Sequence, residues 1–263
     1  MGLASRLVST PAWKRVAKHY YPFVTRHGAD DVVFLNLGYE EDPPMGVPLQ
    51  PSDEPDRYCI QLYHRTAAQI DLSGKRVLEV SCGHGGGASY VVRALRPAAY
   101  TGLDLNPDGI EVCRKRHQLP GLEFVQGNAE ALPFADNSFD VVINIEASHC
   151  YPSPASFFSE VARVLRPEGR LLYADVRHRG HFAEWEKELA DAPLRMLSSR
   201  VISAEVVRGL EKSLPRSQQM FTRRTPRPLR RLVGNAVAAS QLRIADGLRR
   251  GESSYRMYCF ANE

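Results

Sequence analysis

Between residues 77 and 176, short apolar segments alternate with helical segments, and this pattern constrains the fold of the 263-residue chain more than any other feature. We expect strands at 77–80, 99–104, 122–125, 140–145 and 170–176, with helices up to Leu95, at 107–116 and at 157–165. A glycine cluster separates the first strand from its helix. Such alternation with short connections predicts an α/β fold, a mostly parallel sheet covered by helices on both faces.

The segments on either side of this core have different patterns. Residues 5–25 have apolar side chains at roughly helical spacing, residues 41–56 resemble an irregular connection, and a short helix is expected at about 57–70. Residues 179–250 look helical and polar, and the aromatic segment 255–260 predicts a final strand. We therefore expect a helical lid over 1–70, a core over 71–177, a helical cap over 178–250 and the last strand within 251–263. Six strands can be placed in this way, but a seventh cannot.

Composition narrows the class of protein. Hydrophobic residues make up 43% of the chain and charged residues 24%, as in a folded globular protein. No run approaches the roughly eighteen apolar residues of a membrane span, and the start lacks a signal-peptide pattern. Five scattered cysteines without a C-x-x-C pair argue against disulfides and a zinc site, and the carboxylates lack the spacing of a divalent-metal site. We expect a cytoplasmic protein without a metal, for which a homodimer is compatible with the sequence.

The net charge of +4 is unevenly distributed. Residues 1–28 contain five basic and no acidic residues, and residues 223–250 contain eight arginines and one aspartate. These segments either meet an anionic surface or form solvated helix faces. For the first helix, peripheral contact with an anionic inner leaflet and a lid over a substrate pocket both remain open. No nucleic-acid partner is expected, because a base-binding motif and a recognition domain are both missing.

The glycine cluster has the composition of a ligand-binding turn. In residues 81–87, glycines let the backbone turn sharply and let a ligand approach the main-chain N–H groups. The spacing also satisfies a dinucleotide fingerprint, so the cluster alone is a weak signal. Its neighbours strengthen it: Glu79 lies within the first strand, and Asp104 ends the second, where a carboxylate can accept both hydroxyls of a ribose.

On segments 77–85, 103–104, 134–142 and 164–169, the stretch from Val77 to Val176 resembles the core of class I S-adenosylmethionine-dependent methyltransferases. The resemblance implies a seven-stranded sheet with an antiparallel last strand, and S-adenosylmethionine as cofactor. It implies that the amino-acid part of the cofactor lies against Ser81, Gly83 and Gly85, its ribose on Asp104, and its adenine between Leu105 and Ala129.

The same resemblance adds further candidate cofactor residues: Tyr39 as an aromatic cover, Glu79, His84 in the turn, Asn128, Glu130, and Glu146 at the methionine end. Packing is the alternative for Tyr39, and a buried anchor for the turn is the alternative for Glu79. The family usually has Asp where this chain has Asn128. An amide accepts without the assistance of a charge, so a modestly weaker cofactor affinity is expected.

His149 follows the fourth strand, and Asp175 ends the fifth, at the sheet edge where open α/β sheets bind ligands. We expect His149 to face the cleft as a general base, with Asp175 fixing its tautomer and stabilising the imidazolium. Small-molecule O-methyltransferases of this fold often carry both residues. A structural histidine bonded to a loop carbonyl is the alternative.

A second resemblance covers nearly the whole chain except about 210–250. Segments 39–45, 62–67, 79–90, 146–151 and 254–260 are similar to mycobacterial phthiotriol and phenolphthiotriol dimycocerosate methyltransferases and to glycopeptidolipid fatty-acid O-methyltransferases. This implies O-methylation of a polyketide-derived lipid or related hydrophobic natural product. A methyltransferase of the same fold acting on a sugar hydroxyl or another small metabolite is the alternative, and a binding protein without catalysis is the third.

Overall fold

The sheet of the computed structural model, which describes residues 32–223 and 225–263, has seven strands in the order β3-β2-β1-β4-β5-β7-β6. They are β1 (Arg76–Val80), β2 (Ala99–Asp104), β3 (Leu122–Gln126), β4 (Phe139–Ile145), β5 (Leu165–His178), β6 (Arg195–Val201) and β7 (Ser253–Ala261). Strands β1 to β5 are parallel, and β7 is antiparallel to β5 and β6. The expected class, a mostly parallel sheet with an antiparallel last strand, is confirmed. The helix expected at 5–25 lies outside the described residues.

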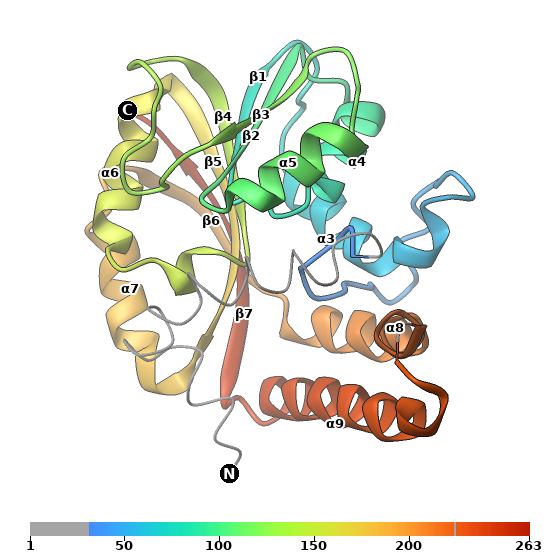
Figure 1. Ribbon diagram of the computed structural model, residues 1–263. Coiled ribbons are helices and arrows are strands. Elements are labelled where there is room, and N and C mark those ends of the chain that lie inside the picture. The colour runs from blue at the N-terminus through green and yellow to red at the C-terminus, as the bar shows by residue number, and fades with distance from the viewer. Residues whose placement is uncertain (1–31, 224) are drawn as a thin grey trace.

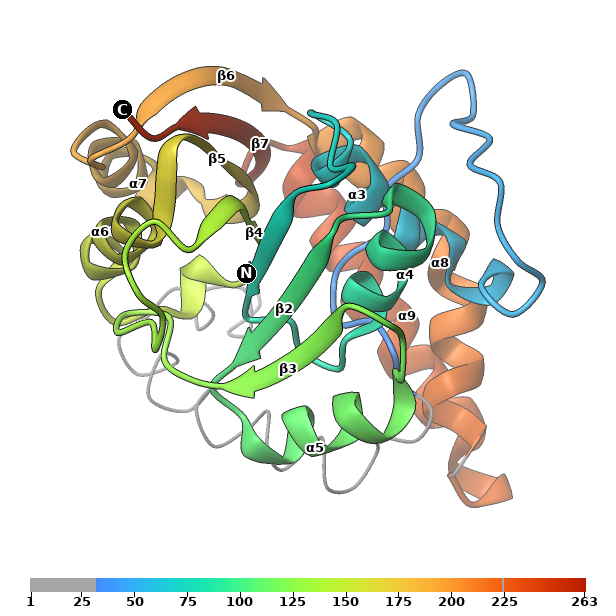
Figure 2. The ribbon, with the colours of Figure 1, turned by 90° about the horizontal axis from the view of Figure 1, so that it is seen from above.

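Helices cover both faces of this sheet (Figures 1 and 2). The α-helices are α3 (Arg57–Ala67), α4 (Gly86–Leu95), α5 (Pro107–Arg116), α6 (Pro154–Val164), α7 (Phe182–Ala190), α8 (Ser203–Arg223) and α9 (Arg230–Arg249). Buried apolar residues form one core cluster with α3, α4 and α5 and another with α6 and α7, on opposite faces of the sheet. The apolar runs of the central strands are therefore explained by burial on both sides.

Strand β6 corrects the expectation that residues 179–250 are helical. It pairs with β7, and all seven of its residues are exposed. Sequence patterns reveal strands mainly through burial, so an exposed edge strand of arginines, serines and a few apolar residues gives little periodic signal. The strand that could not be placed from the sequence is this one.

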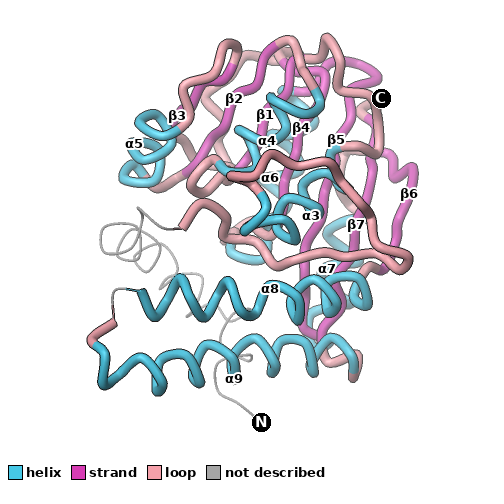
Figure 3. The backbone as a smooth tube through the Cα atoms, turned by 90° about the vertical axis from the view of Figure 1, so that its right-hand side faces the viewer, coloured by secondary structure: helices cyan, strands magenta, loops and turns pink. Residues whose placement is uncertain are grey.

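Helices α8 and α9 form a long hairpin that extends beyond the sheet (Figure 3). The base of α8 packs against the segment that follows residue 37: the backbone N–H of Glu40 donates to the carbonyl of Glu205 over 3.0 Å. A Cβ atom on Gly209 would lie only 2.1 Å from the backbone nitrogen of Tyr39. Gly209 therefore permits the close approach of α8 to this segment.

Candidate active site

A cavity of about 540 Å³ lies at the carboxyl ends of β1, β2 and β4. Its wall contains nine of the predicted site residues, namely Ser81, Gly83, His84, Asp104, Leu105, Asn128, Ala129, Glu130 and Glu146. The turn after β1 bends away from the sheet at Ser81 and Gly83, whose φ angles are 65° and 57°. The position of the cavity is that of ligand sites in open α/β sheets.

The carboxylate of Asp104 organises the turn. Its Oδ2 accepts from the N–H of Gly83 over 2.8 Å, and its Oδ1 accepts from the N–H of Asn106 over 2.9 Å. Burial raises the pKa of Asp104, and the backbone hydrogen bonds oppose that change. Each carboxylate oxygen has a second lone pair, so both can also accept hydroxyl donors from a ligand.

The remaining wall suits a nucleoside with an amino-acid extension. Leu105 is 46% exposed, and with Ala129 it offers an apolar contact for a flat base. Asn36 donates from its amide nitrogen to the carbonyls of Leu37 and Cys59, which leaves its buried Oδ1 without a hydrogen-bond partner. An acceptor in the wall that lacks a donor fits a ligand carrying an amine. These residues therefore fit S-adenosylmethionine.

Three predicted cofactor residues, Glu79, Gly85 and Tyr39, do not line the cavity. Glu79 lies beneath the turn and accepts from the hydroxyls of Tyr63 and Tyr100 over 2.9 and 2.8 Å, and burial raises its pKa to about 7. Gly85 caps the start of α4 with a φ of 76°. Tyr39 is fully buried and donates its hydroxyl to Glu41 over 2.8 Å. Glu79 and Tyr39 support the site from behind, because Glu79 lies within β1 and α8 packs closely against Tyr39.

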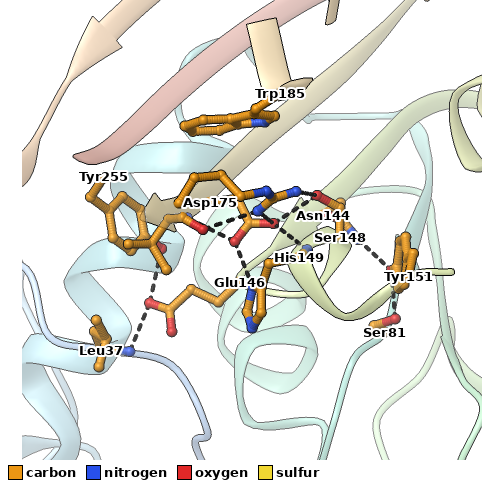
Figure 4. A network of polar contacts seen from close by, with 12 residues as sticks. Leu37, Ser81, Asn144, Glu146, Ser148, His149, Tyr151, Asp175, Trp185 and Tyr255 are labelled. Atoms are coloured by element: carbon orange, nitrogen blue, oxygen red, sulfur yellow. Dashed lines mark hydrogen bonds and ion pairs between the residues drawn. The ribbon is translucent and has the colours of Figure 1, made fainter. Parts of the chain in front are cut away.

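The segment Val33–Asn36 lines the cavity where Tyr39 was expected to do so. Glu146 holds this segment: its Oε1 accepts from the N–H of Leu37 over 2.8 Å and from the hydroxyl of Tyr255 over 2.9 Å (Figure 4). Burial raises the pKa of Glu146 to about 7. No local pattern marks Val33–Asn36 as site residues, because they reach the site only through tertiary packing.

Asn128 departs from the family pattern, and the structure shows how its amide is used. Its Oδ1 accepts from the N–H of Glu130 over 3.0 Å within a tight local turn. A carboxylate of Glu130 in turn accepts from the N–H of Ser153 at the start of α6. The turn after β3 is therefore held to α6 through residues of the cavity wall.

His149 and Asp175 meet at the carboxyl ends of β4 and β5 (Figure 4). Nδ1 of His149 lies 2.8 Å from Oδ1 of Asp175, and the two side chains are 10% and 0% exposed. The other carboxylate oxygen of Asp175 lies 2.9 Å from Nη1 of Arg177 and accepts from the hydroxyl of Ser148 over 2.7 Å. The carboxylate thus connects the imidazole to a buried guanidinium.

The charges in this cluster set opposite pKa shifts. Burial opposes a charge on His149, but the Asp175 carboxylate, the Cys150 side chain and hydrogen bonds to both raise its pKa to about 10. Burial also opposes a charge on Asp175, but Arg177 and His149 hold its pKa well below the usual range. Both shifts favour the ion pair of an Asp175 carboxylate with a protonated His149.

The imidazole does not lie in the wall of the large cavity, which corrects the expectation that it faces the cleft. Cys150, its neighbour in the chain, does line that cavity. His149 borders a second cavity of about 20 Å³, together with Arg177 and Trp185. Residues 148–150 form a short 3-10 helix, and its turn separates adjacent side chains onto different sides.

The sequence analysis did not predict three residues of this cluster, namely Arg177, Ser148 and Trp185. The Arg177 guanidinium carbon lies 4.9 Å from the centre of the Trp185 ring, and Nη2 donates to Ser148 over 2.8 Å. One signal was available for Arg177: it follows Asp175 by two residues on a strand, so both side chains point to one face. Ser148 and Trp185 come from other elements, and nothing in their local sequence marks them.

The described part of the chain lacks two features, a membrane-spanning helix and a cluster of metal ligands. No helix within residues 32–223 and 225–263 combines the length and apolar character needed to cross a membrane. Over the same residues, no three His, Cys, Asp or Glu side chains come together as metal ligands would.

Comparison with known proteins finds a methyltransferase domain over residues 78–173. The chain is 57% identical over 262 residues to phthiotriol/phenolphthiotriol dimycocerosates methyltransferase 1 of Mycobacterium ulcerans, covering 99% of this chain and 95% of that protein. It is 55% identical to a fatty-acid O-methyltransferase of Mycolicibacterium smegmatis, with coverages of 99% and 98%. A crystal structure of the geranyl diphosphate C-methyltransferase of Streptomyces coelicolor, which contains S-adenosyl-L-homocysteine, matches with a TM-score of 0.68 at 14% identity, covering 97% and 99% of the two chains. That level of identity shows the shared fold alone.

Proposed function

Because this chain belongs to the S-adenosylmethionine-dependent methyltransferases, in the family of the mycobacterial phthiotriol/phenolphthiotriol dimycocerosates methyltransferases, we propose that it methylates a hydroxyl of a polyketide-derived lipid or related hydrophobic natural product. The names of the full-length relatives support the lipid class. The contact of 2.8 Å between His149 and Asp175, beside the cofactor cavity, carries the proposal of a hydroxyl acceptor. A hydroxyl must lose a proton on methylation, and an imidazole held by a carboxylate can take it.

Three wall residues would hold the cofactor, and a fourth would hold the segment that covers it. Asp104 would accept the ribose hydroxyls, Ser81 and Gly83 would contact the amino-acid part, and Glu146 would keep the covering segment in place. When bound, S-adenosylmethionine supplies a methyl group on a sulfonium, which is a good leaving group. The protein then has to position the acceptor and remove its proton, and positioning alone accounts for a large part of such a barrier.

In the proposed step, the acceptor O–H proton passes to Nε2 of His149 while the oxygen–methyl bond forms and the sulfur–methyl bond breaks. Asp175 keeps the proton of Nδ1 in place, so Nε2 is the nitrogen that receives the substrate proton. The acceptor would approach Nε2 from the side of Cys150, the wall residue next to His149. To act as a base His149 must be neutral. The surroundings raise its pKa, and a positive charge bound in the nearby cavity would lower that pKa in the required direction.

The test is methyl transfer from isotope-labelled S-adenosylmethionine to mycobacterial lipid extracts and to a purified lipid diol, followed by mass spectrometry. We expect a labelled methyl ether on the lipid, and a kcat about 10²–10⁴-fold lower in the His149→Ala variant with cofactor affinity retained. His178→Ala, a histidine at the end of β5, is the control and should keep its rate. An unchanged rate in His149→Ala would show that His149 is not the general base. Labelled methyl groups found on sugars alone would show that the acceptor is a sugar and not a lipid.

A further inference from the structure

The hairpin of α8 and α9 carries a concentrated positive charge. Residues 213–245 contain seven arginines and no lysine, aspartate or glutamate, whereas the whole chain has a net charge of only +4. Arg216, near the middle of α8, pairs with Asp56 over 3.2 Å. Among the described residues, no acidic side chain forms an ion pair with Arg227, Arg231 or Arg243. The outer half of the hairpin, residues 227–243, therefore carries arginines that no acidic side chain in the described part of the chain compensates.

Apolar side chains are exposed between these arginines. Leu229 and Leu232, at the turn between the two helices, are 49% and 68% exposed, and Leu242 on α9 is 45% exposed. On α9 the buried positions, Gly234 and Ala245 among them, lie on the side that packs against the rest of the fold. The exposed side thus combines leucines with arginines. A helix surface of this kind binds in the interface of an anionic bilayer, where leucines enter the headgroup region and arginines meet phosphates.

The hairpin is mechanically connected to the active site. Two residues of α8 contact Glu40. Nζ of Lys212 lies 3.1 Å from Oε2 of Glu40, and Arg208 donates to the carbonyl of Glu40 over 3.0 Å. The segment that ends at Glu40 begins with the cavity-lining residues Val33–Asn36. At its other end, α9 leads into Ser253, which pairs with His178 at the carboxyl end of β5. The hairpin therefore projects from the same end of the sheet as the active site (Figures 1 and 3).

We propose that the outer half of this hairpin, residues 227–243, is a docking surface for an anionic lipid bilayer. Docking there brings the carboxyl end of the sheet toward the membrane, from which a lipid acceptor has to be taken. The charge decides between lipid and a second copy of the chain, since two such cationic hairpins repel each other. The inference does not depend on the reaction, because binding to vesicles is measured without an acceptor.

The test is co-sedimentation of the full chain with vesicles of equal parts phosphatidylglycerol and phosphatidylcholine, and with pure phosphatidylcholine. At low salt we expect binding to the anionic vesicles alone. This binding should be lost at about 1 M salt, where the Debye length falls to about 3 Å. The triple variant Arg227→Gln, Arg231→Gln, Arg243→Gln should bind about 100-fold more weakly, from about five-fold for each arginine. A Leu229→Ser, Leu232→Ser variant should also lose binding, since these side chains contribute apolar area.

The matched control is Lys75→Gln, Arg76→Gln, Arg96→Gln, which removes three positive charges at the amino-terminal edge of the sheet. It should bind like the unchanged protein. An equal loss of vesicle binding in this control would mean that net charge alone causes the binding, and it would overturn the proposed docking surface. Full binding by the hairpin variant would overturn it as well. No binding to anionic vesicles at low salt, or a hairpin-dependent dimer in place of vesicle binding, would also overturn it. All variants should keep their affinity for S-adenosylmethionine, which establishes that they are folded.

Discussion

Asp175 and Arg177 lie two residues apart on β5 and form an ion pair of 2.9 Å, with side chains 0% and 7% exposed. The pair leaves one carboxylate oxygen of Asp175 for Nδ1 of His149. Because Arg177 keeps Asp175 ionised, the carboxylate can hold the imidazole at any ordinary pH. The sequence predicted a pair of His149 and Asp175. The structure adds Arg177 behind the aspartate, so three charged groups interact.

We first predict that Arg177→Met destabilises the protein by about 3–5 kcal/mol, because it removes one of the two charged partners of the buried Asp175 carboxylate and leaves only His149. Urea unfolding of the variant measures the free energy. Arg166→Met is the matched control: it breaks the more exposed pair with Asp140 and should cost about 0–1 kcal/mol. Equal losses in the two variants would contradict the importance given to the buried pair.

The Asp175→Asn variant should lower the pKa of His149. In the unchanged protein this pKa is raised from 6.5 to about 10, so the stability that His149 contributes is complete below about pH 6.5 and disappears as the pH rises toward 10. Without the carboxylate charge, burial is opposed by the Cys150 side chain alone, so the pKa of His149 falls. NMR titration of the imidazole measures the shift directly, and stability curves from pH 6 to 10 should flatten in the variant. A pKa that stays near 10 would exclude Asp175 as the cause.

For Asp104→Asn, we expect S-adenosylmethionine to bind about 10- to 100-fold more weakly, since hydrogen bonds to a charged group contribute about 1.5–3 kcal/mol. Isothermal titration calorimetry gives the affinity. Asp71→Asn, at an exposed turn, provides the comparison and should bind normally. Unchanged affinity in Asp104→Asn would mean that the ribose is not held at this carboxylate.

Gly209→Ala should destabilise the fold by about 1–3 kcal/mol, because its Cβ would lie 2.1 Å from the backbone nitrogen of Tyr39 and would force α8 away. Gly247→Ala on α9 is the counterpart: nothing lies within 4 Å of its Cβ position, so the variant should gain about 0.4–1 kcal/mol. Thermal unfolding of both variants should move in opposite directions. A loss in Gly247→Ala as large as in Gly209→Ala would show a general helix effect instead of a close contact.

Local periodicity was sufficient for the central elements. The segment expected as a helix at 107–116 is α5 with the same bounds, and β2 runs over the expected 99–104. Both carry signals that depend on neighbours in the chain, namely a proline at the helix start and a run of residues buried on both faces. Strand β6 carries neither signal, because it lies exposed at the edge of the sheet.

The cavity wall divides in the same way. Ser81, Gly83 and Asp104 sit at strand ends, so a parallel sheet alone brings them to one edge. Tyr39 was placed in the wall by resemblance, whereas packing against α8 buries it and leaves Val33–Asn36 to line the cavity.

Strands β1 to β5, the glycine turn and the acidic residue Asp104 at the end of β2 were determined by the sequence itself, because each depends on periodicity or backbone freedom within a few neighbouring residues. Only the tertiary structure decided that Arg177 stands behind Asp175, that His149 borders a separate small cavity, and that an arginine-rich hairpin projects beside the site. These depend on distances between side chains from separate elements, and packing sets those distances.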